Sequence, residues 1–371
     1  MKIGILTQRI RGNYGGVLQN YALQAILKER GHNPVTIDEP TLVYKKDITF
    51  VLRIMKRAIS KLLGDKNVLY VNPQKQINVY SNQDSHKEFV DKYLNRIIRN
   101  YPLSASITEQ EGFDGYIVGS DQVWRPTYQT DLGNCFLDFT AGQNVKRGAY
   151  AASFGVDHWE MTVEQTEYIK RFCDDFDMVT VREDSAVELC KNNLQLDAQH
   201  VVDPTMLLTA EHYKRLISPV LLDRKEKIVV AYFLDKTPAK IETVNKLCQQ
   251  HGATPLYIGD LIDEKYQSIE HWLNGFNQAK YVVTDSFHGT VFSILFQKQF
   301  IVFGNKQRGQ SRFTSLLKMF GIEDRLVGSD CKPEQLKPID YSAVNEILSQ
   351  KREYALNIVD SFLKNQRIQN I

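Results

Sequence analysis

Residues 2–38 read KIGILTQRIRGNYGGVLQNYALQAILKERGHNPVTID and contain one complete strand–helix–strand pattern. The apolar runs at 2–6 and 35–38 do not alternate with polar residues, which is typical of strands buried on both faces of a parallel sheet. Between them we expect an apolar-periodic helix over 17–30, which Gly31 would end. The stretch therefore predicts a doubly wound α/β unit.

Asn13, Gly15 and Gly16 lie between the first strand and this helix. Glycines let a backbone approach another group closely, and a helix that begins beside them directs its free N–H groups to the same place. That arrangement favours an anion. We therefore expect residues 12–16 to form a loop that contributes to an anion site.

The same alternation of strands and helices recurs along the chain. Further buried strands are expected at 115–119, 148–152, 178–182, 227–234, 255–259, 281–284 and 300–304, and crossover helices at 238–251, 288–297 and 311–320. Two such series predict two Rossmann-like α/β domains, doubly wound and facing each other across a cleft. We expect an N-terminal domain over 1–217, a C-terminal domain over 218–330, and a final amphipathic helix over 331–371 that packs back across both.

The composition excludes several classes of protein. Hydrophobic residues make up 43% and charged residues 24% of the 371 residues, as in globular proteins. A net charge of +2 gives no reason to expect a nucleic-acid partner. Five scattered cysteines, no signal-peptide pattern and no long apolar run together predict a cytoplasmic protein.

A basic segment over 50–64 departs from this average. Its apolar residues fall on one helical face and its Lys and Arg residues elsewhere. Such a helix either packs on the core with a solvated basic side or lies on an anionic membrane surface. The second alternative would place the protein at the inner face of the membrane.

Polar side chains follow the strands at 115–119 and 148–152. Ser120, Asp121, Gln122 and Trp124 come after the first of these strands and Ser153 after the second. Ligands of open α/β sheets bind beyond the carboxyl ends of the strands, so these residues are expected to face the cleft. Ser or Asp at such a position is equally able to cap a helix.

Charged residues follow other strands. Arg182 would present its guanidinium to a carboxylate or phosphate, or pair with the acidic residues next to it. Asp203 precedes a proline and either holds its loop or a ligand. Arg312 opens another helix and is a second candidate cation for an anionic ligand.

The stretch 281–303, YVVTDSFHGTVFSILFQKQFIVF, is the most informative for chemistry. A buried strand leads into Ser286, His288 and Gly289, and a helix follows at once. A histidine at that position suits proton transfer near neutral pH, or contact with a phosphate as an imidazolium.

No protease, P-loop or α/β-hydrolase motif is present, and the acidic DDFD at 174–177 falls before a strand, on the wrong side of the sheet for a ligand. We therefore expect no metal site and no bound cofactor.

Six motifs in order resemble the polysaccharide pyruvyl transferase family over about residues 3–320. They are GNYGGVLQNYAL, VGSDQVW, YAASFG, VREDSAVELC, DPTMLL and TDSFHGTVFSILFQKQFIVF. The resemblance implies a glycosyltransferase-B fold and transfer of a pyruvyl group from phosphoenolpyruvate, as co-substrate, to sugar hydroxyls. The product would be a ketal on a bacterial surface polysaccharide, such as an exopolysaccharide or capsule, or on its lipid-linked oligosaccharide precursor.

The resemblance also suggests roles for the candidate residues. His288 would contact the donor phosphate or protonate the donor, and Asp121 would be the base that activates a hydroxyl. Donor-binding residues would be Asn13, Gly15, Gly16, Arg182, Ser286, Gly289 and Arg312. Acceptor-binding residues would be Ser120, Gln122, Trp124, which would stack on the sugar, and Ser153. Many family members carry an arginine three residues before the histidine, where this chain has Asp285.

Two alternatives stay open. A glycosyltransferase that uses a nucleotide sugar would have the same two domains and cleft. The missing arginine at position 285 keeps open a second alternative, a non-catalytic relative that binds anions or carbohydrates.

Overall fold

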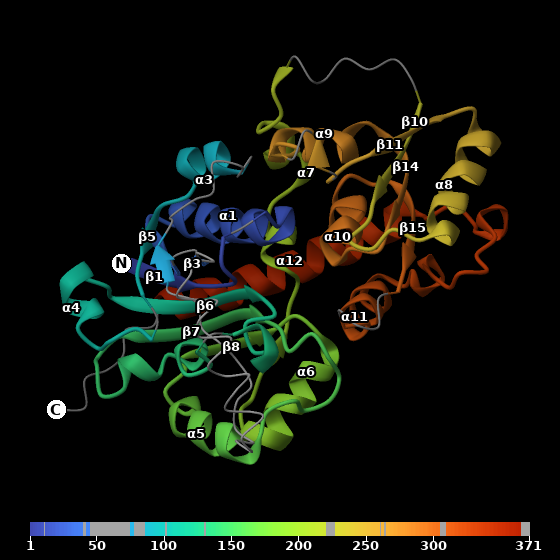
Figure 1. Cartoon of the computed structure of the whole chain (residues 1–371). Helices are drawn as coiled ribbons and strands as arrows, with labels where there is room; N and C mark the ends of the chain where they lie inside the picture. Colours follow the sequence, from blue (N-terminus) through green and yellow to red (C-terminus); the bar gives the residue numbers. More distant parts are fainter. Residues whose placement is uncertain are drawn as a thin grey trace, which may run out of the picture.

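Two parallel sheets form the cores of two α/β domains in the computed structural model (Figure 1). The structure describes residues 1–10, 12–39, 42–44, 75–77, 86–100, 102–129, 131–219, 227–259, 261–262, 265–304 and 309–364. The predicted two-domain α/β fold class is confirmed.

The first sheet has seven parallel strands. Their spatial order is β5 (Arg96–Ile98), β2 (Asn33–Asp38), β1 (Lys2–Leu6), β6 (Gly115–Asp121), β7 (Lys146–Ala152), β8 (Met178–Val181) and β9 (Gln199–His200). Every residue of β6 and β7 is buried, and the central residues of both strands are apolar or small, as in strands covered on both faces.

The second sheet has five parallel strands. Their order is β11 (Thr254–Tyr257), β10 (Ile228–Tyr232), β14 (Ala279–Thr284), β15 (Gln299–Phe303) and β16 (Leu326–Val327). In each sheet the strand order reverses direction beside the first strand, between β1 and β6 and between β10 and β14. Such reversal points are where open α/β sheets bind ligands.

Helices cover the sheets and make the crossovers. They are α1 (Tyr14–Glu29), α3 (Lys87–Tyr93), α4 (Ile107–Glu111), α5 (Val163–Cys173), α6 (Asp184–Leu189), α7 (Ala210–Lys214), α8 (Pro238–His251), α9 (Ile269–Gln278), α10 (Phe287–Leu295), α11 (Ser311–Phe320) and α12 (Tyr341–Lys364). The helices expected at 238–251 and 311–320 coincide with α8 and α11.

The expected loop at residues 12–16 is wrong in one respect. Gly15 and Gly16 lie in the first turn of α1 and not before it, because Asn13 is the N-cap. The Asn13 side-chain oxygen accepts a hydrogen bond from the Gly16 N–H at 3.3 Å. The helix thus begins three residues earlier than the apolar periodicity predicts.

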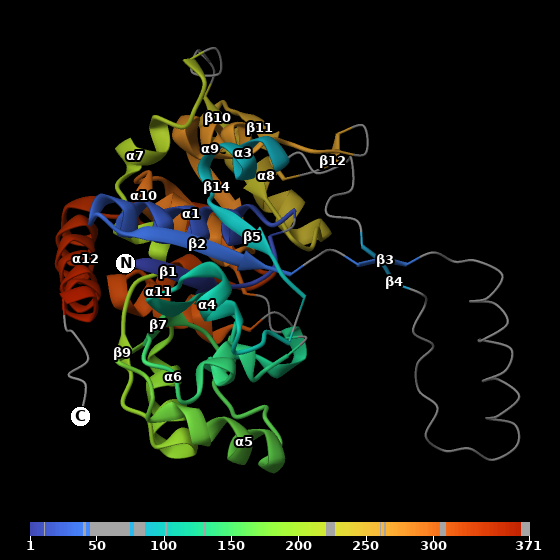
Figure 2. The ribbon, with the colours of Figure 1, turned by 90° about the vertical axis from the view of Figure 1, so that its left-hand side faces the viewer.

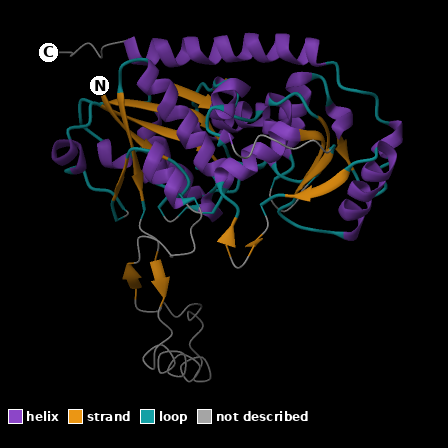
Figure 3. Cartoon of the chain, turned by 90° about the horizontal axis from the view of Figure 1, so that it is seen from above, coloured by secondary structure: helices purple, strands orange, loops and turns teal. Residues whose placement is uncertain are grey.

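Helix α12 lies along both domains (Figure 3). At its start, the Tyr341 hydroxyl donates to the carbonyl of Ser293 in the second domain, at 3.3 Å. Farther along, Arg352 Nε donates to the carbonyl of Met206 at 2.8 Å, and Asp360 forms an ion pair with Arg30 in the first domain. A single cluster of buried hydrophobic residues also includes members of both sheets and of this helix, so the two domains share a core.

Residues 50–64, the basic segment, lie outside the described residues, so the structure does not test their membrane contact. Two short strands on either side of that region, β3 (Leu42–Tyr44) and β4 (Lys75–Ile77), pair antiparallel at a distance from both sheets (Figure 2). None of the helices within the described ranges has the length and apolar character needed to cross a bilayer.

Candidate active site

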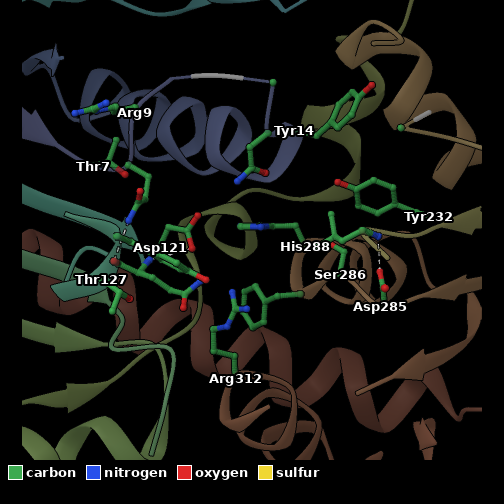
Figure 4. Close-up of a pocket in the computed structure, with 18 of the residues that line it drawn as sticks. Thr7, Arg9, Tyr14, Asp121, Thr127, Tyr232, Asp285, Ser286, His288 and Arg312 are labelled. Carbon is green, nitrogen blue, oxygen red and sulfur yellow. Dashed lines mark hydrogen bonds between the residues drawn. The ribbon is translucent and has the colours of Figure 1, made fainter. Parts of the chain in front are cut away.

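A cavity of about 710 Å³ lies between the two domains, at the carboxyl edges of both sheets. Residues that follow β1, β6, β10 and β14 line it, so it occupies the reversal points of both sheets. Of the residues predicted from the sequence, it brings together Asn13, Asp121, Gln122, Ser286, His288 and Arg312. Figure 4 shows His288 near its centre, between Asp121 of the first domain and Ser286 of the second.

The N-termini of three helices meet at this cavity. Tyr14 begins α1, Phe287 begins α10, and Arg312 lies in the first turn of α11; all three line the cavity. Helices α1 and α10 begin in the same way, with a polar cap whose side chain accepts from a glycine N–H three residues later. In α10, Ser286 Oγ accepts from the Gly289 N–H at 3.3 Å. The convergence of three positive helix ends creates a favourable environment for an anion.

Gly15 packs directly against the His288 ring. A Cβ placed on Gly15 would lie 2.7 Å from the His288 Cβ, and closer still to Nδ1 and Cγ. Real side chains do not approach this closely, so only glycine allows the start of α1 to pass the imidazole. The adjacent glycines in the opening stretch therefore have different roles. Gly15 leaves room for the His288 ring, and the Gly16 N–H donates to the capping side chain of Asn13.

His288 is 5% exposed and held between charged groups. Its Nε2 lies 3.6 Å from Asp203 Oδ2, and no described residue forms a hydrogen bond with that nitrogen. Asp203 is itself fixed by the hydroxyls of Ser120 and Thr205, at 3.1 and 2.6 Å. Burial acts to raise the pKa of Asp203, but His288 and Arg182 hold it well below its usual range. Asp203 is therefore an ionised carboxylate that lies next to the His288 imidazole, on the side away from the cavity.

Arg182 is not exposed to the cavity, and the expectation that its guanidinium binds the donor directly is not supported. Its side chain is 1% exposed and forms ion pairs with three carboxylates: Asp203 at 2.9 Å, Asp121 at 3.2 Å and Glu183 at 3.6 Å. The guanidinium also lies 4.3 Å from the centre of the Phe287 ring. We call Arg182, Asp121, Glu183 and Asp203 the buried charge cluster; of its members only Asp121 lines the cavity.

Arg312 is the arginine that lines the cavity from the second domain. Its guanidinium lies 5.7 Å from the Phe287 ring, which Arg182 also approaches. Burial, and then the charge of Arg182, lowers the pKa of Arg312 to about 10, so it remains a cation at neutral pH. An arginine of this kind suits a carboxylate or phosphate.

Asp121 has an unusual backbone for a non-glycine residue, with a φ of 73°. Such strain is concentrated at functional sites. Burial acts to raise its pKa, but Arg182, His288 and Arg312 more than offset that effect and lower it. A carboxylate of lowered pKa is a weak base, which reduces the support for Asp121 as the group that activates a hydroxyl.

Asp285 occupies the position of the missing arginine and has a different role. It is buried and forms an ion pair with Lys240 Nζ at 2.6 Å. The same carboxylate accepts from the N–H groups of Leu234 and Asp235, at 2.6 and 3.0 Å. Asp285 thus fixes the loop after β10, which forms one wall of the cavity.

Several predicted residues lie behind the cavity and do not line it. The hydroxyl of the buried Ser153 donates to Glu183, and that of Ser120 donates to Asp203. The N–H groups of Gly16 and Gly289 donate to the capping side chains of their helices. Their contacts support the residues that do line the cavity.

Trp124 does not reach the cavity, so the expectation that it stacks on a sugar is corrected. It is fully buried, lies parallel to Phe136 with ring centres 5.1 Å apart, and donates from Nε1 to the carbonyl of Cys135 at 2.9 Å. Trp124 follows the end of β6, but its side chain points into the core.

Replacing Trp124 with Ala is therefore expected to destabilise the protein by about 3–5 kcal/mol, the usual cost of emptying a large aromatic core position. Urea unfolding measures this loss. Isothermal titration of the folded variant with any ligand of the cavity should give a dissociation constant close to that of the wild type. A weakened ligand affinity with unchanged stability would argue that Trp124 binds the ligand after all.

Sequence reasoning missed several lining residues: Thr7, Gln8, Arg9, Tyr14, Glu39, Thr127, Tyr128, Gln129 and Tyr232. Thr7, Gln8 and Arg9 follow the first predicted strand, so the rule that placed Asp121 would have found them.

The acidic stretch at 174–177 lies at the start of β8, at the opposite edge of the sheet. Within the described ranges, no group of His, Cys, Asp and Glu residues has a metal-binding arrangement.

Comparisons with known proteins agree with this architecture. Residues 13–307 match the model of the family described as polysaccharide pyruvyl transferase. The curated proteins give no match. UDP-GlcNAc 2-epimerase from Methanocaldococcus jannaschii is similar in structure, with a TM-score of 0.50 and 10% identity over 97% of this chain and 100% of that one. UGT89C1 from Arabidopsis thaliana, complexed with UDP-L-rhamnose, has a TM-score of 0.50 and 7% identity over 97% and 98%. These likenesses concern the fold alone, and the expected glycosyltransferase-B architecture is confirmed.

Proposed function

Because the chain belongs to the polysaccharide pyruvyl transferase family, we propose that it transfers a pyruvyl group from phosphoenolpyruvate to two hydroxyls of a sugar. The product is a pyruvate ketal on a bacterial surface polysaccharide or its lipid-linked precursor. The observation that carries the proposal is the meeting of three helix N-termini around the buried His288 and Arg312. Phosphoenolpyruvate carries a phosphate and a carboxylate, and these groups match such a site without a metal or a bound cofactor.

In the proposed reaction, His288 delivers a proton to the methylene carbon of the donor, or binds its phosphate while that proton arrives. Protonation makes the central carbon cationic, and one sugar hydroxyl forms a C–O bond to it and loses its proton. The bond to the phosphate oxygen then breaks, and phosphate leaves with the electron pair. A second hydroxyl attacks the same carbon and closes the ketal. One hydroxyl proton replaces the proton given to the methylene carbon and the other ends on the phosphate, so that phosphoenolpyruvate and a diol give a ketal and inorganic phosphate.

The chain's own residues divide this work. Arg312 and the starts of α1 and α10 bind the two anionic groups of the donor. Asp203 keeps the imidazole of His288 in place. Burial of His288 restricts water, which would otherwise compete with the sugar hydroxyls. We also propose that the protein works in the cytoplasm, at the inner face of the membrane if residues 50–64 contact the lipid.

The proposal is tested by thermal stabilisation with phosphoenolpyruvate, compared with UDP-glucose and UDP-N-acetylglucosamine at equal concentration. A ligand that binds only the folded state stabilises it by about 2.7 kcal/mol at a hundredfold excess over its dissociation constant. We expect phosphoenolpyruvate to raise the melting temperature and the sugar nucleotides to leave it unchanged. A shift with a sugar nucleotide alone would instead indicate a glycosyltransferase. Binding of phosphoenolpyruvate without phosphate release, over a panel of acceptors, would indicate a non-catalytic relative.

A further inference from the structure

Tyr128 differs from the other aromatic side chains that line the cavity. It belongs to the single turn Pro126–Tyr128, on the first domain, and is 46% exposed. Tyr14, Tyr232, Phe233 and Phe287 also line the cavity, but each is buried. An exposed tyrosine on the wall of a polar cavity has its ring available to a ligand.

The ring is supported from behind by an arginine that is itself held in place. The Arg125 guanidinium lies 4.9 Å from the centre of the Tyr128 ring. Both oxygens of Glu160 accept from Arg125, at 3.0 and 3.2 Å, and Gln122 Oε1 accepts at 3.1 Å. Because the arginine stacks on one face, the exposed part of the ring is its other face and edge.

Amide side chains fix the same segment from the cavity side. The carbonyl of Gln122 accepts from Gln8 Nε2 at 2.9 Å and from Gln129 Nε2 at 3.0 Å, and all three residues line the cavity. Thr127, labelled in Figure 4, adds a hydroxyl residue to the lining of this first-domain wall. The cavity wall that carries Tyr128 thus also carries amide and hydroxyl side chains of the kind that bind sugar hydroxyls.

Tyr128 lines the same cavity as the proposed donor groups, Arg312 and His288, and lies on the first-domain wall. A ligand stacked on the ring would therefore be presented to a donor bound by Arg312 and His288.

From these contacts we infer that Tyr128 is the platform on which the acceptor's pyranose ring stacks. This inference rests on the proposed function and names the residue that selects and orients its sugar. The face of an aromatic ring carries a partial negative charge, which attracts the C–H groups on one side of a pyranose. Closing a ketal needs two hydroxyls of one sugar at the same carbon, so the sugar must be held in one orientation. A tyrosine ring backed by Arg125, on a cavity wall that also carries amide side chains, provides that constraint.

The test compares Tyr128→Ala, Tyr128→Trp and a control, Tyr354→Ala, which removes an equally exposed tyrosine on α12. The probes are methyl glycopyranosides of glucose, galactose, mannose and N-acetylmannosamine, observed by saturation-transfer difference NMR and titration. We expect at least one glycoside to bind the wild type, with the strongest transfer to the C–H protons of one ring face. Its affinity should fall about tenfold or more in Tyr128→Ala, as for truncation of a binding hot spot, and persist in Tyr128→Trp and Tyr354→Ala.

Thermal stabilisation by phosphoenolpyruvate is measured on the same variants. It should be the same in Tyr128→Ala as in the wild type, because the ring belongs to the acceptor side. If it is absent from the wild type as well, the donor proposal fails whatever the glycosides do. If no glycoside binds the wild type, or if Tyr128→Ala binds glycosides as the wild type does, the platform is overturned while the donor proposal stands.

Discussion

Replacing Gly15 with Ala is expected to reduce turnover about 100-fold or more, because the new methyl group would displace the His288 ring. The methyl would overlap the His288 ring, so the imidazole must move or α1 must shift away from α10. A displacement of about 1 Å of a catalytic group is enough for a loss of this size. Because the starts of both helices form the proposed anion site, the stabilisation by phosphoenolpyruvate should also fall.

Gly16→Ala is the matched control for this prediction. Both glycines lie in the first turn of α1, but a Cβ at Gly16 would meet only the Asn13 side chain, at 3.3 Å from Nδ2, and a slight shift of that side chain relieves the contact. The variants are compared by thermal stabilisation with phosphoenolpyruvate and by phosphate release once an acceptor is found. His288→Ala sets the scale, since loss of a general acid costs about 10²–10⁴-fold. Equal behaviour of Gly15→Ala and Gly16→Ala would show that the Gly15–His288 contact is unimportant.

The strands at the centres of the two sheets could be predicted from the sequence because they are buried on both faces. The runs at 2–6, 115–119 and 281–284 lie within β1, β6 and β14, because both faces of these strands are covered and their residues must be apolar or small. Strands of two or three residues, such as β9 and β16, leave too few positions for any period to appear. They lie at the edges of the sheets, and their extended conformation depends on pairing with the neighbouring strand, which the sequence does not show.

Long-range contacts at the site could not be predicted in the same way. The rule that ligands bind beyond strand ends correctly placed Asp121 and His288 at one cavity. It could not show whether Arg182 faces the ligand or the protein, since this depends on Asp121 and Asp203, which are distant in sequence. The same rule failed for Trp124, because a residue after a strand can turn inward and find a hydrogen-bond partner such as Cys135.

The buried charge cluster depends on one cation, and Arg182→Met is therefore expected to destabilise the protein by about 3–5 kcal/mol at neutral pH. Methionine retains much of the packing over Phe287 but leaves the buried carboxylates of Asp121, Glu183 and Asp203 without their shared partner. Arg182→Lys is the matched variant: it keeps the positive charge and loses the fork that reaches three carboxylates, so its loss of stability should be smaller.

The pH dependence identifies the cause of that loss. In the wild type, the pKa values of Asp121 and Asp203 are lowered, so these groups stabilise the fold above their ordinary pKa, and the contribution disappears as the pH falls through the folded values. Without Arg182 these carboxyls are buried with less compensation, so their folded pKa values rise and the folded variant binds protons more readily than the unfolded chain. The stability of Arg182→Met should therefore improve relative to the wild type as the pH falls from 7.5 to 5. Urea unfolding at the two pH values measures the difference in free energy, and a penalty of the same size at both would attribute the loss to packing against Phe287 instead of to charge.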